Sequence, residues 1–315
     1  MFGNGVKRRN KSIAQALYST MIHELSILIP TFNDDCASQV IGLQRLASST
    51  KGLSFEILVS DDASTNQEVV QRNAQINVLE HCRLFRQTKN MGRAANRNFL
   101  VRQANYEWLL FLDCNVGIPN ESYLKNYLLA DKADVVNGGV SIDHNEQLSS
   151  HNLRYKYEQK IAPHHTAQQR QLHPYQSFRT TNFMARREMM LAHPFDENIT
   201  GYGYEDVLFG KRLHDAKISI QHIENPVIIT QFETNEKYVR KLEEAMQTLH
   251  DLQNELTGYS PLLSTVNRLK KTGTLPLVKS TFRKTSQKMR QNLTGDNPRI
   301  SWLNPYKLGY FISIE

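Results

Sequence analysis

Cysteine and long apolar runs are scarce in this chain of 315 residues. Its three cysteines, Cys36, Cys82 and Cys114, are an odd number without the spacing of a metal site. This pattern favours free thiols in a reducing compartment. No apolar segment reaches the length that spans a bilayer, and no apolar signal-peptide core follows the basic residues near the amino terminus. We therefore expect a cytoplasmic protein.

Acidic residues are scarce in the last part of the chain. The whole chain has a net charge of +7, and residues 261–315 hold ten Lys or Arg against two acidic residues. That segment therefore carries a net charge of +8, which leaves −1 for residues 1–260. The basic character belongs to the tail, so it bears on where the protein binds more than on its chemistry.

Apolar residues make up 40% of the chain, which is enough for a sizeable core. Short apolar runs alternate with helical patterns at the spacing of βαβ units, which predicts an α/β fold that begins with a parallel sheet. The predicted strands cover residues 25–29, 55–59, 82–86 and 108–112. Helices are predicted over residues 37–49 and 67–75, and a third helix is predicted to end near residue 104.

Three of these strands end in polar loops that contain aspartate. The loops hold Asp34, the pair Asp61 and Asp62, and Asp113. Because the carboxyl ends of parallel strands share one edge of the sheet, these loops can converge on one ligand. Each loop alone is also explained by a turn or a helix cap. Their recurrence, with Arg97 on the intervening helix, favours a binding site.

The pattern changes after the strand at 108–112. A strand is predicted over residues 134–140. Residues 143–175 are polar and rich in histidine, without a convincing metal-ligand spacing. A long irregular segment of this kind in a compact domain is typical of an active-site lid. Further on, Glu205 and Asp206 stand at the start of a predicted helix, where the helix dipole favours acidic residues.

Six short motifs follow one another across residues 24–232. They are Pro30-Thr31-Phe32-Asn33, Asp61-Asp62-Ala63-Ser64, Asn90-Met91-Gly92 with Ala95-Asn96-Arg97-Asn98, Phe111-Leu112-Asp113-Cys114-Asn115, Asn182 with Phe195-Asp196-Glu197, and Gly203-Tyr204-Glu205-Asp206. In this order they resemble the family 2 glycosyltransferases. The resemblance implies the GT-A fold, a Rossmann-like, mixed and mostly parallel sheet flanked by helices. It also implies transfer of a sugar from a nucleotide donor, usually with inversion at the anomeric carbon.

The same resemblance assigns donor-binding roles. Thr31, Asn33 and Asp62, with Asp61 as an alternate, would bind the uracil and ribose of a UDP-sugar. Arg97 would face the base or the pyrophosphate. The donor implied by these positions is a UDP-sugar.

The metal motif of the family, Asp-x-Asp, falls at Asp113-Cys114-Asn115. It would hold Mn²⁺ or Mg²⁺, which offsets the charge that develops on a pyrophosphate leaving group. The second aspartate of the motif is Asn115 here, and an amide oxygen binds such a cation more weakly than a carboxylate. His222 is a candidate additional ligand, and a half-exposed strand histidine is the alternative interpretation.

The Glu-Asp motif would supply the catalytic base. Asp206 matches the residue that takes the proton of the acceptor hydroxyl, and Glu205 would contact donor or acceptor. Asn182 is expected at the acceptor, a glycan or a lipid-linked glycan. A catalytically impaired GT-A-like binding or scaffold protein is the competing hypothesis, because of Asn115. A nucleotidyltransferase is disfavoured because its glycine-rich phosphate loop is missing after the first strand.

The chain is divided into a lead-in at 1–24, a catalytic domain at 25–235 and a helical, basic extension at 236–315. Apolar residues at helical spacing over 236–256 predict an amphipathic helix that packs on the catalytic domain or on a second subunit of a homodimer. Beyond it, basic and apolar residues alternate. Such a mix is typical of peripheral contact with the inner face of a membrane, and a solvated appendage is the alternative. No motif predicts binding to nucleic acid.

Overall fold

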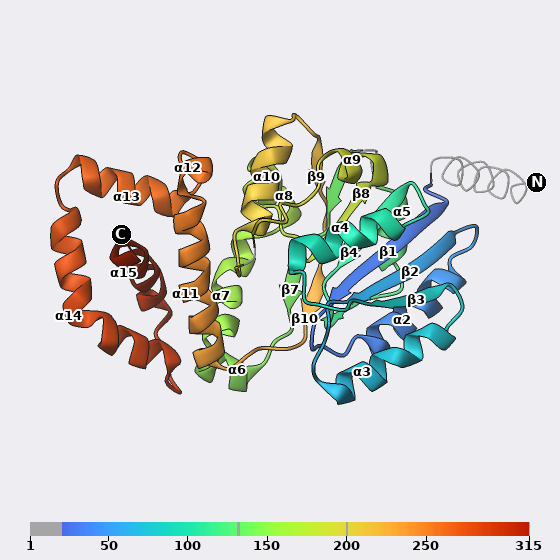
Figure 1. Ribbon diagram of the computed structural model, residues 1–315, viewed down its shortest axis with the longest axis horizontal. Coiled ribbons are helices and arrows are strands. Elements are labelled where there is room, and N and C mark those ends of the chain that lie inside the picture. The colour runs from blue at the N-terminus through green and yellow to red at the C-terminus, as the bar shows by residue number, and fades with distance from the viewer. Residues whose placement is uncertain (1–20, 131–132, 200, 315) are drawn as a thin grey trace, which may run out of the picture.

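The computed structural model describes residues 21–130, 133–199 and 201–314, so nearly all of the predicted lead-in lies outside the described residues. Within them, seven strands form the central sheet in the order β3-β2-β1-β4-β8-β6-β9 (Figure 1). They are β1 (Glu24–Thr31), β2 (Ser54–Asp61), β3 (Cys82–Arg86), β4 (Trp108–Leu112), β6 (Val135–Asn137), β8 (Asn182–Arg186) and β9 (Ile220–His222). Strand β8 runs antiparallel to both of its neighbours, and the other pairs are parallel. The predicted mixed, mostly parallel sheet is confirmed.

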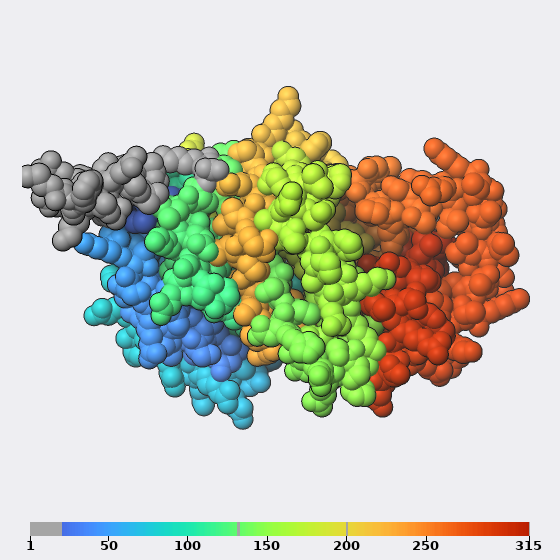
Figure 2. Space-filling view, turned by 180° about the vertical axis from the view of Figure 1, so that it is seen from behind, coloured from blue at the N-terminus to red at the C-terminus, as the bar shows by residue number. Residues whose placement is uncertain are grey.

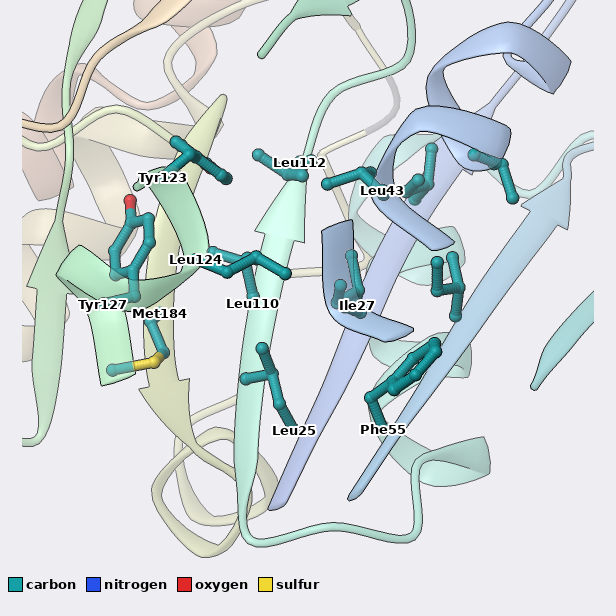
Figure 3. Packing of buried hydrophobic residues seen from close by; sticks show 14 of the residues in the cluster. Leu25, Ile27, Leu43, Phe55, Leu110, Leu112, Tyr123, Leu124, Tyr127 and Met184 are labelled. Atoms are coloured by element: carbon teal, nitrogen blue, oxygen red, sulfur yellow. The ribbon is translucent and has the colours of Figure 1, made fainter. Parts of the chain in front are cut away.

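Helices cover both faces of this sheet. They are α2 (Ala37–Ser49), α3 (Gln67–Ala74) with the short η1 (Gln75–Val78), α4 (Arg93–Gln103), α5 (Tyr123–Leu128), α9 (Arg187–Ala192) and α10 (Glu205–Asp215). Helices α2 and α5 pack on one face, where Ile27 and Leu110 point toward Leu43 and Leu124 (Figure 3). Helices α4, α9 and α10 pack on the other face. Leu28 of β1 belongs to the hydrophobic core on that face. Successive strand residues thus enter opposite cores, which is why the central strands are apolar without alternation.

A second, smaller sheet has the order β5-β10-β7. Its strands are β5 (Val116–Gly117), β7 (Val140–Ile142) and β10 (Val227–Ile229). The strand predicted over residues 134–140 is divided between β6 and β7 at Gly138 and Gly139. A Cβ at Gly138 would lie 2.3 Å from the Tyr127 hydroxyl, and Gly139 has a φ of +84°. Only glycine fits this crowded, left-handed corner, so the chain can leave one sheet and enter the other.

The prediction of an irregular segment over residues 143–175 was wrong. The segment forms α6 (Glu146–His151), α7 (Leu153–Ile161), η2 (Ala162–His164) and α8 (Ala167–Leu172). The side chains of Asn145, Asn152 and Thr166 cap the three α-helices by accepting backbone N–H groups. Leu153 and Tyr155 anchor the segment in the interior. Because so few of its residues are apolar, its helices have too little periodicity to be read from the sequence.

The carboxyl-terminal part is a separate helical layer. It contains α11 (Asn235–Asp251), α12 (Gln253–Leu256), α13 (Pro261–Lys271), α14 (Leu275–Thr294), η3 (Ile300–Trp302) and α15 (Leu303–Ile314). These helices lie at the end of the molecule opposite β1–β3 (Figures 1 and 2). The predicted amphipathic helix over 236–256 is present as α11 and α12, and α11 contacts α7, α14 and α15. No helix in the described ranges is long and apolar enough to cross a membrane.

Candidate active site

The central feature of the site is Asp113, which follows β4 at the carboxyl edge of the sheet. One carboxylate oxygen accepts a hydrogen bond from Arg97 Nη2 at 2.9 Å, and the other accepts one from Thr181 Oγ1 at 2.9 Å. Its side chain is 37% exposed, whereas that of Arg97 is 3% exposed. Burial opposes the charged form, but the positive charges of Arg97 and Arg93 prevail and lower the pKa of Asp113. Asp113 is therefore an anion that remains open to a ligand on one side.

The loop from Asp113 to Asn115 is clamped by Gln39 of α2. The side-chain amide of Gln39 donates from Nε2 to the carbonyl oxygen of Asp113 at 3.0 Å and accepts at Oε1 from the backbone N–H of Asn115 at 3.2 Å. Thr230 Oγ1 donates to the carbonyl oxygen of Asn115 at 2.7 Å. Asn115 has a φ of 59°, a left-handed conformation that asparagine tolerates better than most residues. The loop is thus fixed by contacts from both sides.

The pair Asp113 and Asn115 fits a hard divalent cation. Both offer oxygen ligands, and Mg²⁺ or Mn²⁺ at such sites takes its remaining ligands from phosphates and water. In the ranges that the structure describes, no group of three or more His, Cys, Asp or Glu is arranged to hold a metal. A cation held by Asp113 and Asn115 would need phosphate or water oxygens to complete its coordination.

Asp61 and Asp62, at the end of β2, hold the loops that follow β2 and β3. Asp62 accepts the backbone N–H groups of Met91 and Gly92 at 2.8 and 2.9 Å, one on each carboxylate oxygen. Burial raises the pKa of Asp62, although these two hydrogen bonds oppose the shift. Asp61 Oδ1 accepts the backbone N–H of Ser64 at 2.9 Å. Both carboxylates thus shape the loops at this edge.

Thr31 at the end of β1 and Asn33 in the loop after it are similarly engaged. Asn33 has a φ of 55°, and its Oδ1 accepts the backbone N–H groups of Thr65 and Asn66 at 2.8 and 2.9 Å. Thr31 is buried and donates from Oγ1 to the carbonyl oxygen of Asp34 at 2.8 Å. These contacts join the first loop to the second and bring the predicted donor-binding residues to one edge of the sheet.

Glu205 and Asp206 begin α10, after Tyr204, whose φ is 64°. Glu205 Oε1 lies 3.5 Å from Arg93 Nη1, and its buried Oε2 has no hydrogen-bond partner among the described residues. Burial and then the charge of Glu205 raise the pKa of Asp206 from its ordinary value of 3.8 to about 6, and the positive charges of Arg179 and Arg97 oppose the shift. Arg97 thus acts on both Asp113 and Asp206.

Helix α11 of the carboxyl-terminal extension reaches this site. The Nζ atom of Lys241 lies 5.2 Å from the centre of the Tyr202 ring, and the guanidinium of Arg93 lies 4.7 Å from the same centre. Lys241 also pairs with Glu233 at 3.1 Å. Burial raises the pKa of Asp34, while the charges of Lys237 and Lys241 oppose that shift. Lys237 and Lys241 of α11 therefore act on Asp34 in the loop after β1, and Arg93 acts on both Asp34 and Asp113.

Comparison with known proteins gives the family. The sequence profile described as "Glycosyl transferase family 2" matches residues 26–193, which is more than half of the chain. The chain belongs to glycosyl transferase family 2. The family is one of transferase enzymes, and the sheet and flanking helices described above are its GT-A fold.

Relatives of this family 2 protein share only part of their length with it. An uncharacterized glycosyltransferase of Haemophilus influenzae is 33% identical over 89 residues, which are 28% of either chain. Chondroitin synthase of Pasteurella multocida is 29% identical over 153 residues, 47% of this chain and 14% of the synthase. The chain thus spans well under half the length of these two curated relatives.

A solved structure supports the fold. The mannosyltransferase PcManGT from Pyrobaculum calidifontis, in complex with GDP-Man and Mn²⁺, superimposes with a TM-score of 0.50 at 16% identity. The match covers 73% of this chain and 64% of the mannosyltransferase. At this level of identity the likeness concerns the fold alone.

The structure of the family 2 protein does not bring His222 to the predicted metal position. His222 ends β9, which is separated from β4 by β8 and β6, a span of about 14 Å at the usual strand spacing. Its Nδ1 accepts from Arg170 Nε at 3.1 Å, and its Nε2 lies 2.9 Å from the carbonyl oxygen of Pro174. Burial and the charge of Arg170 lower the pKa of His222 to about 4, against the Pro174 hydrogen bond. A metal role for His222 does not fit this geometry.

Asn182 and Arg97 also lie deeper than expected. Asn182 Oδ1 accepts from the hydroxyls of Tyr123 and Tyr127 at 2.6 and 2.7 Å, and Nδ2 donates to two backbone carbonyl oxygens, at 2.8 and 2.9 Å. The amide is buried and fully bonded, which leaves it no free group for an acceptor. Arg97 is buried, donates to Asp113 and has its guanidinium 5.6 Å from the Phe195 ring centre, so it helps to orient Asp113; a contact with the base or the pyrophosphate remains a prediction.

Sequence reasoning missed four residues at the site. They are Gln39, Arg93, Thr181 and Lys241. Thr181 could have been suspected because it directly precedes Asn182, which belongs to one of the six motifs. The other three reach the site only through the packing of α2, α4 and α11, for which the sequence carries no local signal.

Proposed function

We propose that this family 2 protein transfers a sugar from a UDP-sugar to a hydroxyl of a glycan or lipid-linked acceptor, with inversion and with help from a divalent cation. The observation that carries the proposal is the state of Asp206. It is a carboxylate beside Glu205 whose pKa is raised to about 6. A base with a pKa just below neutrality is deprotonated at working pH and still accepts a proton from an attacking hydroxyl.

The other residues of the site take complementary roles. Asp113 and Asn115 would hold the cation, which supplies positive charge to the departing nucleoside diphosphate. Asp206 would take the proton of the acceptor hydroxyl as its oxygen attacks the anomeric carbon from the side opposite the leaving group. Arg97 keeps Asp113 ionised, and Arg93 holds Glu205 beside the base.

The relatives are consistent with this reaction class. The mannosyltransferase of the same fold binds GDP-Man and Mn²⁺, which fits a nucleotide-sugar donor and a divalent cation without selecting the base. The choice of uridine rests on the resemblance of Thr31, Asn33 and Asp62 to the family motifs. The chondroitin synthase relative favours a polysaccharide acceptor.

Asn115 supports a second candidate, a GT-A-like protein that binds nucleotide sugars without turnover. The motif then holds the cation too weakly to activate the leaving group. The two candidates differ in turnover and share nucleotide binding, so one set of measurements separates them.

The test uses the full chain with a panel of UDP- and GDP-sugars, with and without Mn²⁺. Release of nucleoside diphosphate and the mass of the product are measured, together with nucleotide binding by calorimetry. Release from a UDP-sugar that depends on Mn²⁺ and on Asp206 supports the proposed transfer. Binding without release from any donor establishes the second candidate. Absence of binding to every uridine nucleotide removes the proposed UDP-sugar transfer, and absence of binding to every nucleotide sugar of the panel removes both candidates.

A further inference from the structure

The carboxyl-terminal helices contain a stretch with no acidic residue. Between Glu255 and Asp296, residues 256–295 hold eight Lys or Arg and no Asp or Glu. This stretch spans α13, the turn after it and α14. A single-sign segment of this length is unusual in a chain whose remainder is nearly neutral, and the catalytic chemistry proposed above does not use it.

Seven of the eight basic residues lie on the surface of the protein. We call them the outer basic face, and all seven residues are exposed: Arg268, Lys270, Lys271, Lys279, Arg283, Lys284 and Lys288. On α14, Phe282 and Leu293 are buried against the neighbouring helices, whereas the basic residues Lys279, Arg283, Lys284 and Lys288 are exposed. The eighth, Arg290, points inward and pairs with Glu236 and Glu243 of α11 at 2.7 and 2.9 Å. The orientation of α14 is therefore fixed, with its basic residues outward.

The first turn of α14 adds an exposed apolar side chain to this face. Leu277 is 68% exposed, although large apolar residues near it, such as Leu275 and Val278, pack into the helical core. Pro276 beside it is also exposed. Helices α13 and α14 form the extremity of the molecule farthest from the strands β1–β3 (Figures 1 and 2). The face is thus free of the catalytic domain.

We propose that the outer basic face binds the surface of an anionic lipid bilayer, with Leu277 entering the interface between headgroups and acyl chains. Clustered Lys and Arg are attracted to anionic headgroups, and an exposed aliphatic side chain among them gains from burial in the interface. A face built to bind single-stranded nucleic acid would instead be expected to expose aromatic side chains for stacking. The exposed large apolar residue of this face is a leucine, which favours lipid.

The experiment measures co-sedimentation of the full chain with vesicles of phosphatidylcholine alone or mixed with phosphatidylglycerol, at low ionic strength. We compare the wild type with the triple variant Arg283→Glu, Lys284→Glu and Lys288→Glu. The expected result is binding of the wild type to the mixed vesicles only, and at least a ~100-fold lower partition coefficient for the variant. Leu277→Ser should leave binding at low salt largely intact and weaken the part that survives in high salt.

The matched control reverses three exposed basic residues of the catalytic domain, Arg45→Glu, Lys51→Glu and Lys125→Glu. It makes the same change in net charge and should keep most of the binding. Equal loss in both triple variants means that net charge alone acts and overturns the proposal. Retention on immobilised heparin without any vesicle binding identifies a soluble polyanion as the partner and also overturns it. Circular dichroism shows whether each variant is folded, and nucleoside diphosphate release is measured separately, so failure of the proposed transfer does not affect this test.

Discussion

The substitution Asp206→Asn separates a catalytic role of this side chain from a structural one. The pKa of Asp206 lies at about 6 instead of 3.8 because burial and the charge of Glu205 disfavour its ionised form. Above pH 6 the folded chain therefore holds a carboxylate that would be more stable in the unfolded chain. The difference corresponds to on the order of 2–3 kcal/mol of free energy of unfolding.

The sign of the pH dependence follows from this shift. Since the folded pKa is raised, the associated stability is present in full below pH 3.8 and is lost as the pH rises through about 6. Asn carries no charge and keeps a side-chain oxygen for the bond that Asp206 Oδ1 accepts from the backbone N–H of Val207 at 2.8 Å. Asp206→Asn should therefore raise the melting temperature at pH 7 by a few degrees, with little gain at pH 4.

The same substitution should lower the transfer activity, although it raises the melting temperature. Loss of a general base lowers the transfer rate by roughly two to four orders of magnitude, with little change in donor binding. In the wild type, the rate at saturating donor should fall roughly tenfold between pH 7 and pH 5, as Asp206 becomes protonated. The control is Asp215→Asn on the same helix, an exposed residue paired with Lys211, which should alter neither quantity appreciably. Near-normal transfer by Asp206→Asn, or a melting temperature that drops, would refute the reasoning.

Three further outcomes follow from the site and the core. Asn115→Asp should lower the Mn²⁺ concentration that gives the half-maximal rate, because a carboxylate replaces an amide ligand; an unchanged metal dependence would place Asn115 outside the coordination sphere. Asp62→Ala should weaken binding of UDP in calorimetry by at least tenfold, since two backbone N–H groups lose their acceptor and the loop they shape is released; unaltered affinity would contradict a donor role for this loop. Asn182→Ala should lower the free energy of unfolding in urea by about 3–5 kcal/mol, because the hydroxyls of Tyr123 and Tyr127 lose a buried acceptor, and a loss below about 1 kcal/mol would show that the network is dispensable.

The strands and their carboxyl ends could be predicted because their signals are local. An apolar run that stops at a carboxylate, as at Asp113, contains both the strand and its loop within a few residues. The order of the strands is different. The position of His222 depends on β8 and β6 lying between β9 and β4, and no sequence spacing carries that information. The strand order therefore places His222 away from Asp113, which argues against the metal role expected for it.

The partners of the site residues were also outside the reach of the sequence. Asn182 occurs in a motif with Phe195-Asp196-Glu197, yet its surroundings come from α5 and from the corner at Gly138 and Gly139. Lys241 belongs to a helix that the sequence marks only as amphipathic. Which side chain of an amphipathic helix reaches a site depends on how the helix is docked, and docking is decided by contacts far apart in the chain.

The clamp that Gln39 makes across the 113–115 loop affects how the site responds to a donor. One amide holds the main chain at both ends of the loop, and it projects from a helix whose residues Val40 and Leu43 are packed in the core. Ordering a residue costs about 1–2 kcal/mol of conformational entropy. Because this loop is already ordered when the chain folds, that cost does not reduce the free energy of ligand binding. Under the proposed function, a nucleotide sugar would bind to a loop that is already ordered, and its binding free energy would remain available for contacts with the cation and the phosphates and for distortion of the sugar.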